Sequence, residues 1–132
     1  IQYSRSYIYT TALPPAIAAA TIASLKIVRE ETWRRDKLGH LIARFRSGAE
    51  QIGLQLAKSN TPIQPVLIND DEKVMEVGKQ LRASGFLVGA IRPPTVPVGT
   101  GRLRITFSAD HSEEQVDQLV AALDSLNLSA AV

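Results

Sequence analysis

The chain has 132 residues, of which 45% are hydrophobic and 21% are charged, and its formal net charge is +2. This length suits one domain or a piece of a larger protein, and the composition argues against disorder and against a coiled-coil rod. Only 5% of the residues are aromatic and acids interrupt the basic runs, so we expect no nucleic-acid partner.

Cysteine is absent, which excludes disulfides and thiolate metal sites and suits a reducing compartment, so a cytoplasmic location is expected. The longest uncharged run, residues 6–25, is interrupted by prolines and hydroxyl residues. We therefore expect no membrane span, and the run also lacks the basic start of a signal peptide. Because the chain begins at Ile1 rather than Met, we interpret it as part of a longer protein.

Residues 14–53 are expected to be helical. Pro14 and Pro15 suit a first helical turn, where a missing N–H costs little, and residues 16–28 are rich in alanine and other good helix formers. Apolar residues in 33–52 recur with the three-and-four spacing of an amphipathic helix. This region therefore holds one long bent helix or two helices in succession.

Residues 62–128 are expected to form an α/β region, which starts with a strand and a helix. Residues 63–68 (IQPVLI) are β-branched and bounded by turn residues, and Pro65 among them indicates an edge strand. A helix should follow, because the polar residues at 69–71 can cap its start and Gly85 can end it. Its predicted buried face consists of Val74, Val77 and Leu81.

Two more strands and a last helix complete the predicted order. Residues 86–91 and 102–108 are predicted to be strands, and the second alternates between apolar residues on one face and Arg102, Arg104 and hydroxyl residues on the other. The run SEEQ at 112–115 has the form of a capping box. The order predicts an α+β fold, with a small, mostly antiparallel sheet and helices packed on one face.

Few side chains are candidates for catalysis or metal binding. His40 lies among charged residues and is interpreted as a surface residue, whereas His111, beside the last helix, is interpreted as structural. The two do not have metal-ligand spacing and no Cys could assist them, so no metal site is expected. The run GTG at 99–101 is followed by a strand, which favours a tight connection over a nucleotide loop.

Arg102 and Arg104 are the strongest candidates for a binding site. They project from one face of a predicted strand, directly after a loop stiffened by prolines. A guanidinium on a rigid element can grip a carboxylate with two parallel hydrogen bonds. An ordinary exposed strand face fits the same pattern equally well.

Two segments, YIYTTALPPA at 7–16 and AIRPPTVPVGTGRLRITFSADHS at 90–112, closely resemble the C-terminal part of the α-oxoamine synthases. These are pyridoxal-phosphate enzymes with the aspartate-aminotransferase fold, and the resemblance covers essentially the whole chain in order. It implies that residues 1–132 are the C-terminal small domain of a larger homodimeric enzyme, in which residues 1–13 lead from an absent large domain.

Within this family, the run IRPPTVP is similar to the members of the biotin pathway. Those enzymes condense L-alanine with a pimeloyl thioester of coenzyme A or acyl carrier protein and release carbon dioxide and the thiol. Two alternatives stay open. One is a sister enzyme of the aminolevulinate or 2-amino-3-ketobutyrate type, and the other is a stand-alone module that binds carboxylates.

The resemblance also implies roles for individual residues. Arg104 matches the arginine that binds the carboxylate of the amino-acid substrate, with Arg102 in a supporting role. Arg92 and Thr95 match the loop that approaches the acyl substrate. The hydroxyl pair at 10–11, Thr10 and Thr11, matches the pair that reaches the cofactor phosphate of the neighbouring subunit, and hydroxyl donors ahead of a helix suit an anion.

No catalytic residue is expected in this chain, because the family's Schiff-base lysine lies upstream of the matching segment. A reactive lysine and an electron sink are both indispensable to the chemistry, so the chain alone is expected to be inactive. It should also expose the apolar surface that meets the rest of the enzyme. The lysines, none of which lies in a matching motif, are Lys26, Lys37, Lys58, Lys73 and Lys79.

Overall fold

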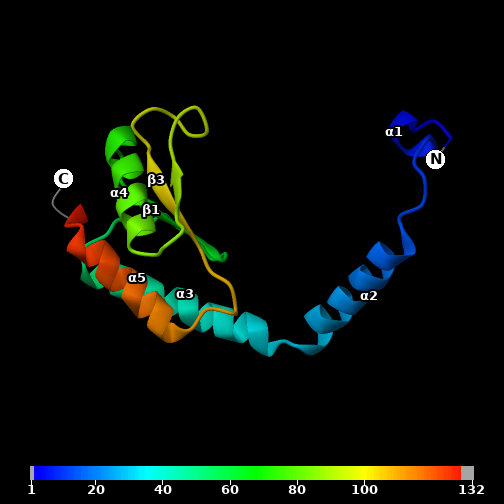
Figure 1. The fold of residues 1–132 in the computed structure, drawn as a ribbon, viewed down its shortest axis with the longest axis horizontal. Helices are drawn as coiled ribbons and strands as arrows, with labels where there is room; N and C mark the ends of the chain where they lie inside the picture. The colour runs from blue at the N-terminus through cyan, green and yellow to red at the C-terminus, as the bar shows by residue number, and fades with distance from the viewer. Residues whose placement is uncertain (1, 129–132) are drawn as a thin grey trace. The chain divides into compact units, whose positions relative to one another are not determined.

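The computed structural model of the chain describes residues 2–128, so residues 1 and 129–132 of the predicted domain 1–132 lie outside the described part. The chain divides into two compact units, Ile1–Trp33 and Arg34–Val132. In Figure 1 the first unit is blue and the second runs from cyan to red. No helix within residues 2–128 combines the length and the apolar character that a bilayer crossing requires.

The first unit consists of two helices, α1 (Arg5–Ile8) and α2 (Pro15–Glu30). The prediction that a helix begins near Pro15 is confirmed, with a proline in the first turn. The four-residue helix α1 was not predicted. No residue of α2 is buried, and the large apolar side chains exposed in this unit are Tyr3, Tyr7, Ile8, Tyr9, Leu13, Ile17, Ile22, Leu25, Ile27, Val28 and Trp33.

Helix α3 (Trp33–Gln51) lies in the second unit except for its first residue. Of the two possibilities that the sequence left open, two helices in succession is the correct one, because α2 ends at a non-helical Glu31 (φ −100°, ψ 64°). Three residues of α3 at four-residue spacing are buried, as a helix packing along one stripe requires. They are Leu41, Phe45 and Ala49.

The second unit contains a three-stranded antiparallel sheet in the order β1-β3-β2. The strands are β1 (Ile63–Leu67), β2 (Gly89–Ile91) and β3 (Arg102–Thr106). The predicted fold class, α+β with a small antiparallel sheet, is confirmed. The predicted strand 86–91 is half as long as expected, because the Phe86 N–H donates to the Leu81 carbonyl (2.8 Å) and closes the preceding helix instead of joining the sheet.

Strand β1 lies at one edge of the sheet, as Pro65 indicated, but its outer side is covered. The Leu67 N–H donates to the Gln55 carbonyl (2.8 Å), and the Ala57 N–H donates to the Pro65 carbonyl (3.0 Å). A bridge between Leu56 and Val66 lies between these two bonds. The segment 55–57 therefore pairs with β1 as a short strap.

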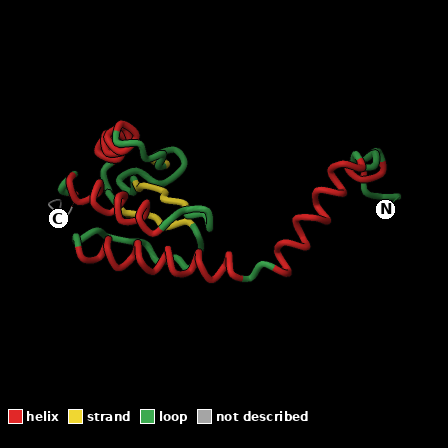
Figure 2. The backbone as a smooth tube through the Cα atoms, turned by 60° about the horizontal axis from the view of Figure 1, so that its bottom comes forward, coloured by secondary structure: helices red, strands yellow, loops and turns green. Residues whose placement is uncertain are grey.

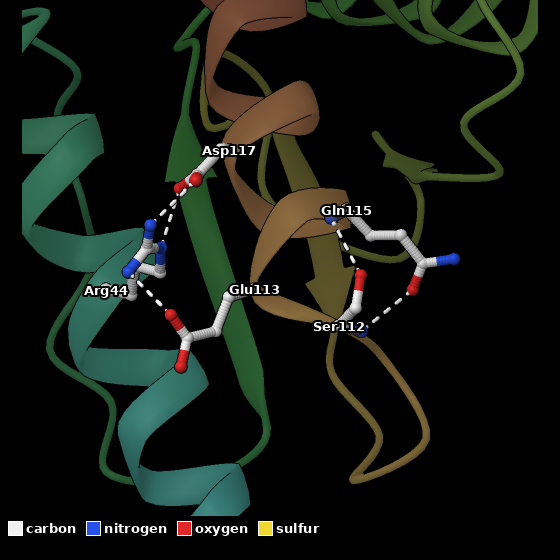
Figure 3. A network of polar contacts seen from close by, with 5 residues as sticks. All are labelled: Arg44, Ser112, Glu113, Gln115 and Asp117. Atoms are coloured by element: carbon white, nitrogen blue, oxygen red, sulfur yellow. Dashed lines mark hydrogen bonds and ion pairs between the residues drawn. The ribbon is translucent and has the colours of Figure 1, made fainter.

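Helices α4 (Asp71–Ala83) and α5 (Glu113–Ser125) complete the second unit. The Asp70 carboxylate caps α4 by accepting from the Glu72 and Lys73 N–H groups. The predicted capping box of α5 is present, with Ser112 and Gln115 bonded reciprocally (Figure 3).

The three helices of this unit and one face of the sheet share a single apolar core. Figures 1 and 2 show α5 running alongside α3. At the centre, the rings of Phe45 and Phe107 lie 5.2 Å apart, and Leu103 is fully buried. Helix α4 packs closely on β2 because Gly78 faces Ala90, where an added Cβ would be only 3.0 Å from the alanine methyl.

One polar side chain, Gln64, is fully buried beside this core. Its Oε1 accepts from Arg46 Nη1 (2.7 Å), and its Nε2 donates to the Thr61 carbonyl (2.7 Å). A buried amide without partners would be costly. These two bonds instead tie the start of β1 to α3.

An exposed arginine joins α3 to α5 (Figure 3). Arg44 Nε and Nη2 donate to the two carboxylate oxygens of Asp117, both at 2.7 Å, and Nη1 donates to Glu113 Oε2 at 2.8 Å. These hydrogen bonds hold the pKa of the Asp117 carboxyl below its ordinary value.

This lowered pKa predicts a pH-dependent contribution to stability. Because the folded-state pKa lies below the unfolded-state value, the contribution is present above the ordinary Asp pKa and is lost as the pH falls through the folded-state pKa. We expect Asp117→Asn to lower the urea midpoint at about pH 7 and to change it little at about pH 2. Asp124→Asn, an exposed site on the same helix, should show a smaller effect at about pH 7. A difference between wild type and Asp117→Asn that does not vary with pH would contradict this assignment.

Candidate functional site

The face of the sheet opposite the helices carries the two predicted arginines. The register pairs Arg104 of β3 with Pro65 on one side and with Gly89 on the other, and alternate residues of each strand share this face. We call this surface the arginine face. Its members are Ile63, Pro65, Leu67, Gly89, Ile91, Arg102, Arg104 and Thr106.

Arg104 is exposed on the central strand, and its side chain lies across Gly89. A Cβ added at Gly89 would be 3.5 Å from Arg104 Cβ and 3.7 Å from its Nε, so a larger residue there would crowd the arginine. Within residues 2–128 the Arg104 guanidinium has no hydrogen-bond or ion-pair partner. All its donors are therefore available to a planar anion such as a carboxylate.

Arg102 lies two residues away on the same strand but is more constrained. It is partly buried, and its Nε donates to the Thr100 carbonyl (3.1 Å). Its guanidinium keeps only part of its donor set for a ligand. Arg102 is therefore held by a backbone contact, whereas Arg104 has no partner within residues 2–128.

Arg92 and Thr95 lie in the loop that joins β2 to β3. The loop begins with a turn in which the Thr95 N–H donates to the Arg92 carbonyl (3.1 Å), around a cis peptide bond between Pro93 and Pro94. Both predicted residues are exposed. Since Ile91, directly before the loop, pairs with Arg102, the loop starts at the end of the arginine face.

The far end of this loop is fastened to the start of α4. The Gly99 N–H donates to Asp71 Oδ2 (3.3 Å), and the Gly101 carbonyl accepts from the N–H groups of Ile68 (3.0 Å) and Asn69 (2.9 Å). Only glycine fits at the buried position 101, because a Cβ there would be 2.9 Å from the Asp70 carbonyl oxygen. Residues 99–101 thus form a tight connection that fixes where β3 begins.

Thr10 and Thr11 lie in the first unit, between α1 and the start of α2, and both are exposed. The Thr10 hydroxyl donates to the Ser6 carbonyl (2.8 Å). Helix α2 has no side-chain cap at Pro14, so its first-turn N–H groups are not satisfied by a capping side chain. Hydroxyl donors ahead of such a helix suit the phosphate end of a cofactor, and Thr10 would have to release the Ser6 carbonyl to act as one. None of the lysines is buried within the described residues.

Sequence reasoning missed the residues that support the arginines. Gly89 makes room for Arg104, and Asp71 holds the loop, with its Oδ1 buried and without a hydrogen-bond partner in the part of the chain that the structure describes. The residues next to Gly89 and Asp71 in the sequence do not indicate either role. The role of Gly89 follows only from the strand register, and that of Asp71 only from the packing of α4 against the loop.

The chain is similar in sequence to a known protein family and to several curated proteins. Residues 1–123 match the family described as aminotransferase class I and II. The chain is 57% identical over 123 residues to the 8-amino-7-oxononanoate synthase of Pseudomonas paraeruginosa, which covers 93% of this chain and 31% of that protein. It is 56% identical over 123 residues to the enzyme of the same name from Hahella chejuensis, again covering 93% and 31%.

The chain is also similar in fold to solved enzyme structures. The serine palmitoyltransferase of Sphingomonas wittichii superposes with a TM-score of 0.86 at 28% identity, covering 94% of this chain and 32% of that one. The 8-amino-7-oxononanoate synthase of Francisella tularensis superposes with a TM-score of 0.82 at 28% identity, covering 96% and 37%. The chain thus spans about a third of the length of the proteins it matches.

Proposed function

The chain belongs to the aminotransferase class I and II family, and from this premise we propose that it is the C-terminal small domain of an 8-amino-7-oxononanoate synthase. The observation that carries the proposal is the 57% identity over 93% of the chain. Residues 1–13 would lead from a large domain, residues 14–53 would be the helical part and residues 62–128 the α/β part.

The whole protein would condense L-alanine with a pimeloyl thioester, on coenzyme A or acyl carrier protein, to give 8-amino-7-oxononanoate, carbon dioxide and the free thiol. Pyridoxal phosphate supplies the electron sink for this chemistry when it is bound. The residues described above fit its phosphate end only. We also propose that the whole protein is a cytoplasmic homodimer, in which Thr10 and Thr11 of one subunit reach the cofactor phosphate of the other.

Arg104 would bind the carboxylate of L-alanine. Its unpaired guanidinium on the central strand, with Gly89 beneath it, supports this role. A bidentate pair would fix the direction of the bond from Cα to the carboxylate, which is the bond that breaks when carbon dioxide leaves. Since carbon dioxide is neutral, the ion pair that holds the group disappears in that same step.

Arg92 and Thr95 would face the acyl substrate, and Arg102 would support Arg104. The fastened loop supports this arrangement, because Gly101 and Asp71 fix the loop end from which β3 starts. A binding group on a rigid element loses less conformational freedom when its ligand arrives.

A sister α-oxoamine synthase is the second candidate, which the superposition on serine palmitoyltransferase favours. The solved structures do not separate the two, because the chain is 28% identical both to serine palmitoyltransferase and to the F. tularensis 8-amino-7-oxononanoate synthase. The alanine enzyme is favoured by the 57% and 56% identity to two curated enzymes of that name. A stand-alone carboxylate-binding module has less support, since the match extends over nearly the whole chain and only about a third of each relative.

The test uses the full-length protein that contains this chain, loaded with pyridoxal phosphate. It is incubated with L-alanine and pimeloyl-CoA, and in parallel with L-serine and palmitoyl-CoA, and with glycine and succinyl-CoA. We expect mass spectrometry to detect 8-amino-7-oxononanoate in the first reaction only. Turnover confined to either parallel reaction would replace the proposal with a sister enzyme, and no turnover with L-alanine and pimeloyl-CoA would refute it.

A further inference from the structure

A hollow of about 400 Å³ lies where β2 and β3 separate, and none of the roles above uses it. The ladder between these strands stops at the pair of Gly89 and Arg104. Continued by two residues, it would pair Val88 with Ile105 and Leu87 with Thr106. These four residues instead line the hollow, together with the start of α5.

The floor of the hollow is apolar. It is made by side chains that also belong to the core or pack against it, so it is preformed by the fold rather than by a ligand. Leu87 stands at the rim and is 84% exposed. The floor residues are Phe86, Val88, Ile105, Phe107, Val116 and Leu119.

Two polar side chains that line the hollow are fixed as hydrogen-bond donors. His111 Nδ1 accepts from the Ser108 N–H (3.1 Å), so the neutral ring carries its proton on Nε2. Gln115 Oε1 accepts from the Ser112 N–H (2.9 Å) in the capping box, so its amide nitrogen keeps both hydrogens for other partners. Figure 3 shows this nitrogen pointing away from Ser112.

The remaining polar lining is neutral. Ser84, Thr106 and Gln118 complete it, and no Lys, Arg, Asp or Glu among residues 2–128 lines the hollow. The Ser84 hydroxyl already donates to the Gln80 carbonyl (3.1 Å). An apolar floor beside fixed donors matches a ligand with an apolar body and an oxygen acceptor. A cationic ligand would find no acidic side chain to pair with there.

We propose that this hollow binds a short aliphatic carboxylate or its amide, with the chain on the apolar floor and the carbonyl-type oxygen on His111 and Gln115. The volume is within the range of small-molecule pockets, which starts at about 300 Å³. The hollow lies where two strands meet the start of a helix. A ligand in it would contact the end of β3 that is remote from the proline-rich loop.

The test measures saturation-transfer NMR of hexanoate, hexanamide and hexylamine with the full-length protein. Hexanoate and hexanamide should receive saturation, and hexylamine should receive little. Gln115→Glu keeps an oxygen for the capping box but replaces the two donors with a carboxylate, so it should weaken hexanoate binding about tenfold or more. Leu87→Ser should weaken it several-fold, and Gln55→Glu, an exposed site outside the hollow with the same change of charge, should leave it unchanged.

The Arg104→Ala variant separates this site from the arginine face. Hexanoate binding should persist in that variant, whatever the fate of the proposed enzymatic activity. Loss of hexanoate binding in Arg104→Ala would assign the probe to the arginine face and overturn the proposal. So would an absence of binding in the wild type, or unchanged binding in a Gln115→Glu variant whose urea midpoint matches the wild type.

Discussion

Replacing Arg104 with alanine in the full-length protein is expected to raise the KM for L-alanine about a hundredfold and to leave the KM for the pimeloyl thioester nearly unchanged. Each hydrogen bond between charged groups contributes about 1.5 to 3 kcal/mol, and a bidentate pair has two of them. Since about 1.4 kcal/mol corresponds to a factor of ten, the lower value for the two bonds together, about 3 kcal/mol, corresponds to two orders of magnitude. Steady-state kinetics with each substrate varied in turn measures the effect.

Two further variants make this result specific. Arg104→Lys keeps the charge but loses the planar fork, so it should recover only a small part of the lost alanine affinity. Arg82→Ala removes an exposed arginine from the last turn of α4 and should leave both KM values unchanged. Unchanged alanine kinetics in Arg104→Ala would refute the carboxylate-binding role.

Phe45→Ala is expected to remove about 3 to 5 kcal/mol from the free energy of unfolding of the chain. The Phe45 side chain is completely buried on α3, and its ring packs against Phe107 just beyond β3. Truncation leaves a cavity between a helix and the sheet, because the closely packed neighbouring side chains can move only partly into the space. Urea denaturation followed by far-UV circular dichroism measures the loss.

The control for Phe45→Ala is Leu87→Ala. Leu87 is 84% exposed, so its truncation should change the free energy of unfolding by about 0.5 kcal/mol or less. Equal losses in the two variants would mean that the core is not centred on Phe45. A loss in Phe45→Ala well below about 2 kcal/mol would mean that the core repacks around the missing ring.

The sequence predicted those elements whose signals are local. The capping box at Ser112 and Gln115 needs only a spacing of three residues, and the alternation in β3 needs only a period of two. Pro15 marks the start of α2 because proline is best tolerated in the first turn. The position of Arg104 on the face opposite the core was predictable for the same reason, since an alternating strand presents every second residue on one face.

Features that depend on distant partners were not predictable from the sequence. Residues 86–88 are apolar and look like strand, but the hydrogen bond from Phe86 to Leu81 ends α4 there instead. Gln64 looks like a polar strand residue, yet it is buried because Arg46 and Thr61 satisfy its amide. The space for the Arg104 side chain depends on a glycine fifteen residues earlier in the chain, which only the register of the sheet reveals.

The strap that covers β1 has a consequence for how this chain associates with copies of itself. Unpaired strand edges are templates for intermolecular β-sheet growth, and a sheet with two free edges can extend in both directions. Here the 55–57 segment occupies the side of β1, so within residues 2–128 only β2 offers a backbone edge, and it is three residues long. That is shorter than the six or seven residues typical of an aggregating segment. Self-association should therefore proceed through apolar side chains, such as those of α2, rather than through amyloid-like pairing of the sheet.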